Sequence, residues 1–440
     1  MTLAQPRRLI RHSHHLLGAL FVCAAVATAC SHSSKSTAAV VKTPAATAPT
    51  ESEIRDLDIE FYAERVKNDP TGATNLARLS ALYLQRSREL GDPRDALRAE
   101  NAARRSIHNR GAHNDQAAQI LSSSLLAQHR FDEALVIARD VSDRDPGNAS
   151  LRAAVAEIEM ELGQYDSARV HFASVADKSS DLSVAPRLAR WAEIEGHQDE
   201  ARRLIRNALA IARRERSLPR EQLAWFWLRT GDVELRMGHV AAADSAYRSG
   251  LTAHPGDYRL LAAMCRLAST KREWDQAIAY GEEAVAANLD PATLGLLSDA
   301  YAATGDTARS REYARVLDVA VLRQPGAYHR AWSLFLLDHD RHVATVYKKI
   351  RMELETRRDV YGYDLLAWAL HKQGRDRQAA DAMHVALAQG TRDPQLVRHA
   401  EIIEQTLKRR DAAARQDGSH GAQNSISDCG EPGACPRVQQ

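Results

Sequence analysis

Several features are scarce in this 440-residue sequence. Aromatic residues make up 5% of it, and β-branched residues hardly ever alternate with polar ones, so the pattern favours helices over strands. Lys and Arg number 59 and Asp and Glu 57, which leaves a net charge of +2. This balance supplies neither the basic excess of a nucleic-acid-binding protein nor an acidic tail. We therefore expect a helical protein without a nucleic acid partner.

Motifs for catalysis and for cofactor binding are also missing. The chain has no Gly-x-Ser-x-Gly, no phosphate-binding Gly-rich loop, no dinucleotide fingerprint, no His-Glu-x-x-His and no Cys-x-x-Cys-His haem site. One cluster, His329 with Asp338, His339, Asp340 and His342, contains residue types that bind metals, but a polar turn between two helices explains it equally well. We expect no cofactor, no metal and no catalysis. A metal-dependent enzyme that uses this cluster is the alternative.

A helical hairpin pattern recurs along the chain, and its clearest copy is residues 227–255. A first helix ends there near Gly238, and Ala243 and Tyr247 share one face of a second helix that ends at Pro255. The residue that opens the second helix recurs at Ala134, Ala168, Ala201, Ala243, Ala277, Ser310 and Ala379. Successive gaps are 34, 33, 42, 34, 33 and 69 residues, which indicates a unit of about 34 residues, one insertion and one weak repeat.

An aromatic, a small residue, a turn Gly, an Ala and a closing Pro in this order resemble the tetratricopeptide repeat (TPR), over residues 73–393. The resemblance implies an all-α fold, a TPR-like right-handed α-solenoid of about nine helical hairpins, whose first helices line a concave groove. It also implies binding of proteins or peptides, and it does not specify which ones.

First-helix positions that packing does not use are expected to face the groove. They are Arg187, Arg190, Asp232, Arg236, Arg259, Arg266, Asp299, Arg330, Tyr361, Asp364 and Trp368. Because guanidinium groups bind carboxylates in a fork, the arginines predict a site for an acidic peptide or a carboxylate. The alternatives are that the charged residues only solvate this face and that the two aromatic residues pack.

The N-terminus has the pattern of an export signal. Arg7, Arg8 and Arg11 precede an apolar run at residues 16–27 that is too short to cross a bilayer as a permanent helix. Small residues directly before Cys30 resemble the bacterial lipobox, which implies a lipid-modified Cys30 and a membrane-anchored lipoprotein facing the periplasm. Cleavage by an ordinary signal peptidase, which would give a soluble periplasmic or secreted protein, is the alternative.

The chain therefore divides into five predicted parts. They are an export signal at 1–30, a flexible tether at 31–50, an N-terminal capping helix at 51–70, the solenoid with a terminal helix at 71–408, and a disordered tail at 409–440. Cys429 and Cys435 in the tail either form a disulfide in an oxidising periplasm or remain two unpaired thiols. We predict a non-catalytic scaffold that binds proteins or peptides at a bacterial cell envelope; an adaptor for envelope assembly or secretion is the alternative.

Overall fold

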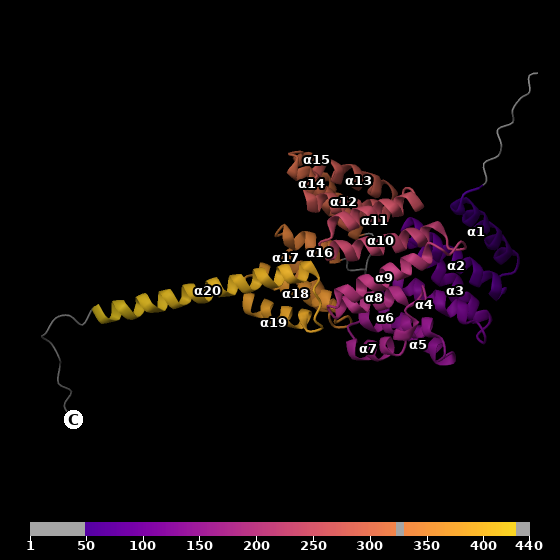
Figure 1. The fold of residues 1–440 in the computed structure, drawn as a ribbon, viewed down its shortest axis with the longest axis horizontal. Helices are drawn as coiled ribbons and strands as arrows, with labels where there is room; N and C mark the ends of the chain where they lie inside the picture. The colour runs from indigo at the N-terminus through magenta and orange to yellow at the C-terminus, as the bar shows by residue number, and fades with distance from the viewer. Residues whose placement is uncertain (1–48, 323–329, 428–440) are drawn as a thin grey trace, which may run out of the picture. The chain divides into compact units, whose positions relative to one another are not determined.

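The computed structural model describes residues 49–322 and 330–427 (Figure 1). The chain divides into two compact units, Met1–Ala48 and Pro49–Gln440, and all the described residues belong to the second. The expected export signal with Cys30 and nearly all of the tether therefore lie outside the described residues. Cys429 and Cys435 lie outside them as well.

Twenty α-helices, one short 3₁₀ turn (Ala176–Lys178) and no strand make up the secondary structure of the described ranges. The first five hairpins are α2 (Ala73–Leu90) with α3 (Pro93–Asn109), α4 (Asp115–Ala127) with α5 (Phe131–Arg144), α6 (Ala149–Glu161) with α7 (Tyr165–Ala173), α8 (Ala185–Ile194) with α9 (Gln198–Ala212), and α10 (Arg220–Arg236) with α11 (Val240–Ala253). Four more are α12 (Tyr258–Lys271) with α13 (Trp274–Ala287), α14 (Pro291–Ala303) with α15 (Thr307–Leu322), α16 (Arg330–Asp338) with α17 (Val343–Glu353), and α18 (Val360–Lys372) with α19 (Asp376–Leu387). Helix α1 (Glu51–Asn68) precedes these nine hairpins and α20 (Pro394–Ser427) follows them. The prediction of an all-α solenoid of about nine hairpins is confirmed.

Small residues set the distance between the two helices of a hairpin. The six alanines that define the repeat are fully buried, and they are Ala134, Ala168, Ala201, Ala243, Ala277 and Ala379. Ser122 Oγ donates to the carbonyl oxygen of Ala134 across one hairpin at 3.0 Å, and Ser298 Oγ donates to that of Ser310 across another, also at 3.0 Å. A larger side chain at these crossings would separate the backbones and break such bonds.

The turn inside a hairpin needs one residue in the left-handed conformation. Gly163, Gly196 and Gly238 take it with φ of 76 to 78°, because a residue without Cβ adopts it at little cost. The eighth hairpin has no glycine there, and Asp340 takes the position with φ of 52°. This explains why α16 and α17 still pair although the repeat pattern is weakest there.

The last helix is longer than predicted. Helix α20 runs to Ser427, whereas the sequence placed the end of the terminal helix at residue 408 and a disordered tail after it. The structure thus has a helix over residues 409–427, where the sequence predicted a disordered tail. Ala412, Ala413 and Ala414 favour helix, which accounts for the continuation past residue 408. No helix in the described ranges is both long and apolar enough to cross a membrane.

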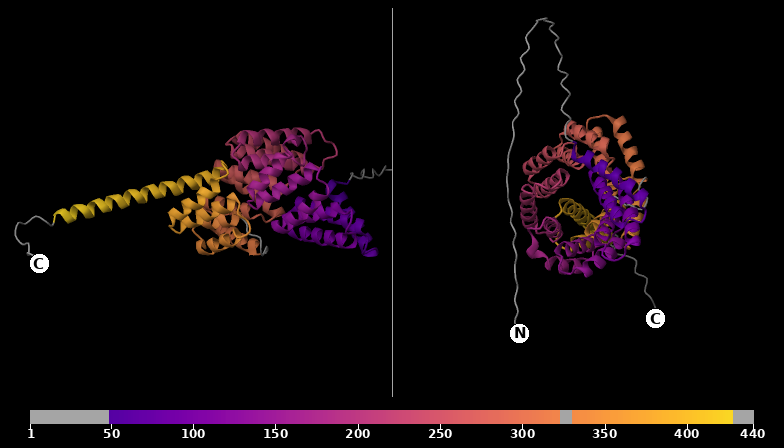
Figure 2. Two further views of the ribbon diagram at one scale, coloured as in Figure 1. Left: turned by 90° about the horizontal axis from the view of Figure 1, so that it is seen from below. Right: turned by 90° about the vertical axis from the view of Figure 1, so that its right-hand side faces the viewer.

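The hairpins follow one another around a superhelical turn, which appears as a ring in the right-hand view of Figure 2. Repeats of an open solenoid contact only their sequence neighbours. Here, hairpins far apart in the chain also touch. Asn288, after α13, donates from Nδ2 to the carbonyl oxygens of Leu90 at 3.2 Å and Gly91 at 3.1 Å, after α2. The segment after α13 therefore contacts the turn of the first hairpin.

Candidate binding site inside the superhelical turn

The third hairpin and the segment before α18 form a seam between two levels of the superhelix. The backbone N–H of Arg358 donates to the carbonyl oxygen of Leu162 at 3.0 Å, and that of Val360 donates to the hydroxyl oxygen of Tyr165 at 2.8 Å. Gly163, in its left-handed turn, lies directly against the Arg358 carbonyl, where a Cβ would collide with backbone atoms. Backbone contacts of this kind hold the ninth hairpin against the third.

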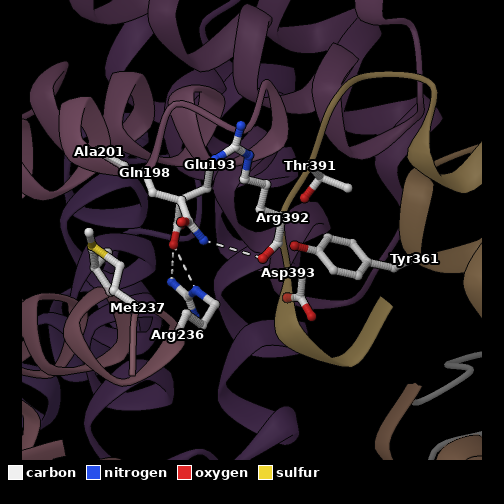
Figure 3. Close-up of a pocket in the computed structure, with 10 residues that line it drawn as sticks. Glu193, Gln198, Ala201, Arg236, Met237, Tyr361, Thr391, Arg392 and Asp393 are labelled. Atoms are coloured by element: carbon white, nitrogen blue, oxygen red, sulfur yellow. Dashed lines mark hydrogen bonds and ion pairs between the residues drawn. The ribbon is translucent and has the colours of Figure 1, made fainter. Parts of the chain in front are cut away.

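A second part of the seam is the segment between α19 and α20 (Figure 3). Gln198 Nε2 donates to the carbonyl oxygen of Arg392 at 3.2 Å, and Arg169 Nη2 donates to Gln389 Oε1 at 3.1 Å. Gly196 lies against the Gly390 carbonyl, again without room for a Cβ. This segment thus covers part of the concave side of α8 and α10.

A cavity of about 300 Å³ remains between the two levels. Five arginines and four carboxylates contribute most of its lining, and they are Arg190, Arg229, Arg236, Arg330 and Arg357 with Glu161, Glu353, Asp359 and Asp393. Tyr361 lies among the arginines: Arg190 Nη1 donates to its hydroxyl at 2.8 Å, and the Arg330 guanidinium carbon is 4.4 Å from its ring centroid. Tyr361 therefore orients two arginines from different hairpins toward one space.

Charge is unevenly distributed on the wall that α8 and α10 form. The carboxylate of Glu193 lies 2.7 Å from Arg236 Nε, 3.5 Å from Arg229 and 3.9 Å from Arg190. Asp232 accepts from Arg266 at 2.7 Å and lies 3.4 Å from Arg229. Four guanidinium groups thus share two carboxylates.

The pKa values on this wall follow from burial and from that crowding. Burial lowers the pKa of Arg229, and the neighbouring Arg236 lowers it further. Burial alone would raise the pKa of Asp232, but Arg266 and Arg229 outweigh it and hold that pKa below its ordinary value. An arginine still remains charged at neutral pH, so the positive charges of this wall are permanent.

The opposite wall is acidic and centres on Arg357. Its guanidinium lies 2.6 Å from Asp359, 3.0 Å from Glu161 and 3.5 Å from Glu353. Burial raises the pKa of Glu161, and burial raises the pKa of Glu353 to about 7. One cation is therefore shared by three carboxyl groups, of which Glu353 takes up a proton near neutral pH.

The predicted groove residues fall into three groups. Four line the cavity, namely Arg190, Arg236, Arg330 and Tyr361. Five are paired elsewhere in the chain: Arg187 with Glu157 at 2.7 Å, Arg259 with Glu221 at 2.7 Å, Asp232 with Arg266 at 2.7 Å, and Asp299 with His339 at 2.8 Å. Asp364 and Trp368 are 0% and 5% exposed, so the prediction that they contact a partner is wrong.

Helix α20 is the reason for that error. His399 Nδ1 forms a hydrogen bond with Asp364 Oδ1 at 2.7 Å. The His399 ring also stacks on the Trp368 ring, with centroids 4.2 Å apart. The repeat register carries no information on this contact, because α20 lies outside the repeats. Conversely, register alone did not identify Arg229 or Arg357 as lining residues.

The Asp and His cluster of the eighth hairpin has local partners. His339 Nε2 lies 2.8 Å from Asp299, which raises the His339 pKa, and Asp340 lies 2.9 Å from Lys372 Nζ. Residues 49–322 and 330–427 contain no group of His, Cys, Asp and Glu arranged to hold a metal ion. His329, the first member of the cluster, lies outside these ranges.

Comparison with known proteins identifies one segment by sequence. Residues 125–184 match the tetratricopeptide repeat family. This segment covers the end of α4 and continues through α7, and the other hairpins have the same two-helix plan. No curated protein matches the chain.

Solved structures of similar fold include helical-repeat proteins of different kinds. The APC/C hetero-tetramer Cut9-Hcn1 is 15% identical with a TM-score of 0.46, and the match covers 80% of this chain and 59% of that one. PilF of Pseudomonas aeruginosa is 18% identical with a TM-score of 0.38, over 51% of this chain and 97% of that one. The human IFIT1 dimer with m7Gppp-AAAA is 11% identical with a TM-score of 0.47, over 75% and 76%.

Proposed function

We propose that this TPR-like scaffold is non-catalytic and binds an acidic segment of a protein or peptide partner inside its superhelical turn. The observation that carries the proposal is the convergence of Arg190, Arg229 and Arg236, from α8 and α10, with Arg330 from α16 on one cavity. Helices from three separate hairpins supply these side chains, so the site exists only when the superhelical turn is closed.

Charge balance favours a carboxylate as the bound group. Arg190, Arg229, Arg236 and Arg266 face the carboxylates of Glu193 and Asp232, and Asp393 from the α19–α20 segment is the third carboxylate beside them. Three cavity-lining guanidinium groups, those of Arg190, Arg229 and Arg236, thus share the carboxylate of Glu193. A carboxylate supplied by a ligand would complete the set with charge-assisted hydrogen bonds.

The size and the opposite wall restrict the ligand further. A cavity of about 300 Å³ accepts a side chain or a chain end, and a folded domain is far larger. Glu161, Glu353 and Asp359 on the opposite wall would repel a ligand that carries many negative charges. The expected ligand is therefore one short peptide segment with a single acidic position at the α8–α10 wall.

We place this scaffold at a bacterial cell envelope, anchored through a lipid on Cys30. The support is the pattern of positive charge, short apolar run and small residues before Cys30 in residues 1–30. Mass spectrometry of the protein from detergent-solubilised membranes tests the anchor: a diacylglycerol-modified N-terminal Cys30 is expected, whereas an unmodified N-terminus would exclude it.

Affinity capture from solubilised envelopes tests the scaffold function. The wild type, an Arg229→Gln/Arg236→Gln variant and an Arg187→Gln control are compared. Arg187 also lies on a first helix and pairs with Glu157, but it does not line the cavity, so it controls for the loss of an arginine. A partner retained by the wild type and the control and lost by the double variant is expected. Equal recovery by all three would exclude the cavity as the site.

A further inference from the structure

The N-terminal helix α1 has two apolar faces, although it packs mainly against one helix, α2, and contacts Arg220 at the start of α10 only through Glu51 near its N-terminal end. Ile59 and Val66 are 6% and 7% exposed and pack against α2. On the outer side Ile54, Leu57 and Phe61 are 47%, 59% and 54% exposed. The spacing of these three residues, i, i+3 and i+7, places them in one stripe along the helix.

An apolar stripe is unusual at this place, because the terminal helices of a solenoid normally turn a polar face outward to keep the protein soluble. Single exposed hydrophobic residues need no explanation, whereas adjacent ones mark interaction surfaces. Val136 on α5 and Val170 on α7, 68% and 67% exposed, are isolated examples that occur singly on their helices. They provide a matched comparison for the α1 stripe.

Acidic residues border this stripe. At 100° per residue, Glu53, Glu60 and Glu64 follow one edge, and all three are exposed. Glu51, Asp58 and Arg65 follow the other edge, with the Arg65 guanidinium carbon 5.5 Å from the Phe61 ring centroid. The two edges together carry five carboxylates, one guanidinium and the ammonium group of Lys67, which lies 3.3 Å from Glu64.

These charges decide which occupant fits the stripe. In a symmetric pair of two copies, an acidic edge of one copy would lie against an acidic edge of the other, and the carboxylates would repel each other. An anionic membrane surface repels the same carboxylates. A helix with basic residues beside its own apolar stripe has the complementary charge and shape.

We propose that the outer face of α1 docks an amphipathic helix of a partner protein, in which Lys or Arg residues flank an apolar stripe. The docked helix buries Ile54, Leu57 and Phe61 and extends the solenoid by one helix at its N-terminal end. Its basic residues pair with Glu60 and compete with Lys67 for Glu64, whereas Glu53 is held by the capping hydrogen bonds of Thr50. This surface is separate from the interior cavity, so neither proposal depends on the other.

Fluorescence anisotropy with labelled model peptides tests the proposal on the full chain. One helical peptide has a Leu stripe flanked by Lys, and a second has the same stripe flanked by Glu. The protein variants are Leu57→Ser/Phe61→Ser, Glu60→Lys/Glu64→Lys and, as the control, Val136→Ser/Val170→Ser. All the substituted side chains are exposed, so their circular dichroism and Tm should match those of the wild type.

We expect the Lys-flanked peptide to bind the wild type and the control equally, and each α1 variant at least about tenfold more weakly. The Glu-flanked peptide should bind Glu60→Lys/Glu64→Lys better than it binds the wild type. Equal binding of the Lys-flanked peptide by all the proteins would overturn the proposal. Three other results would also overturn it. The wild type could sediment as a dimer that the Leu57→Ser/Phe61→Ser variant does not form, or the wild type could float with anionic vesicles while that variant does not. A cross-linker placed at Phe61 could react with residues 1–48 of the same chain.

Discussion

The backbone N–H of Arg358 donates to the carbonyl oxygen of Leu162 at 3.0 Å and thereby joins the loop before the ninth hairpin to the turn inside the third. Main-chain bonds between segments so far apart in sequence are foreign to an open solenoid, whose repeats contact their neighbours. Closure of the superhelical turn is therefore a specific property of this chain, and the interior cavity depends on it.

Substitution of the seam glycines should open the turn. Gly163, Gly196 and Gly238 share φ of 76 to 78°, so alanine costs about 1 kcal/mol or more of backbone strain at each of them. At Gly163 and Gly196 the added Cβ would also meet backbone of the later hairpins, whereas Gly238 has nothing within 4 Å. We expect Gly163→Ala and Gly196→Ala to increase the radius of gyration in small-angle X-ray scattering. Gly238→Ala should lower only the Tm; an equal expansion in all three variants would contradict the seam.

Among the charged residues of the seam, Arg357 is the one whose substitution should lower the stability most. Its replacement by Met leaves Glu161, Glu353 and Asp359 without their shared cation, and breaking such a partly buried network costs about 3 kcal/mol. The loss should appear as a lower Tm at pH 8 and should shrink at pH 5, where carboxyl groups with raised pKa values are protonated. A variant with the wild-type Tm at both pH values would rule out this role.

Glu353 should make the stability of the closed turn depend on pH. Because burial raises its pKa from 4.5 to about 7, the ionised form destabilises the folded state. The destabilisation is absent below pH 4.5, develops between pH 4.5 and 7, and is complete above pH 7. Glu353→Gln should therefore raise the free energy of unfolding at pH 8, by up to about 3 kcal/mol, and should lose this advantage below pH 4.5. A gain that is the same at pH 4 and pH 8 would contradict the assignment.

At Gly231 in α10, helix propensity and packing predict opposite effects of a substitution to alanine on stability. Propensity alone predicts that Gly231→Ala stabilises a helix by about 1 kcal/mol. A Cβ at this position would overlap the ring of Tyr247, which is 0% exposed and has no space to move. We therefore expect a destabilisation of about 2 kcal/mol in thermal unfolding. A stabilised variant would show that the α10–α11 crossing is looser than the structure describes.

The repeat register was sufficient for the fold and insufficient for the site. Ala134 and Ala243 identified the hairpins, because small residues at a helix crossing are a local requirement with a fixed spacing. Tyr361 and Trp368 occupy the same helix and looked equivalent in the sequence. Only the fold separates them, since Tyr361 borders the cavity while His399 from α20 stacks on Trp368.

The seam shows the same limit of sequence information. Gly163 was recognisable as a turn glycine, but the Arg358 carbonyl that lies against it belongs to a distant hairpin. Its position results from small rotations between hairpins summed over a whole turn, which no local pattern records. Arg229 was missed for this reason: the cavity that it lines forms only between hairpins that are far apart in the sequence.

Binding of a short acidic peptide to the purified full chain tests the central claim most directly. Fluorescence anisotropy would compare a labelled peptide that carries a single glutamate with its glutamine analogue. The glutamate peptide should bind the wild type and the Arg187→Gln control with the same Kd, and Arg229→Gln/Arg236→Gln at least about tenfold more weakly, since each charge-assisted hydrogen bond contributes about 1.5–3 kcal/mol. The glutamine peptide should bind none of the three measurably. Equal binding of the two peptides, or of the glutamate peptide by all three proteins, would contradict an arginine-lined carboxylate site inside the superhelical turn.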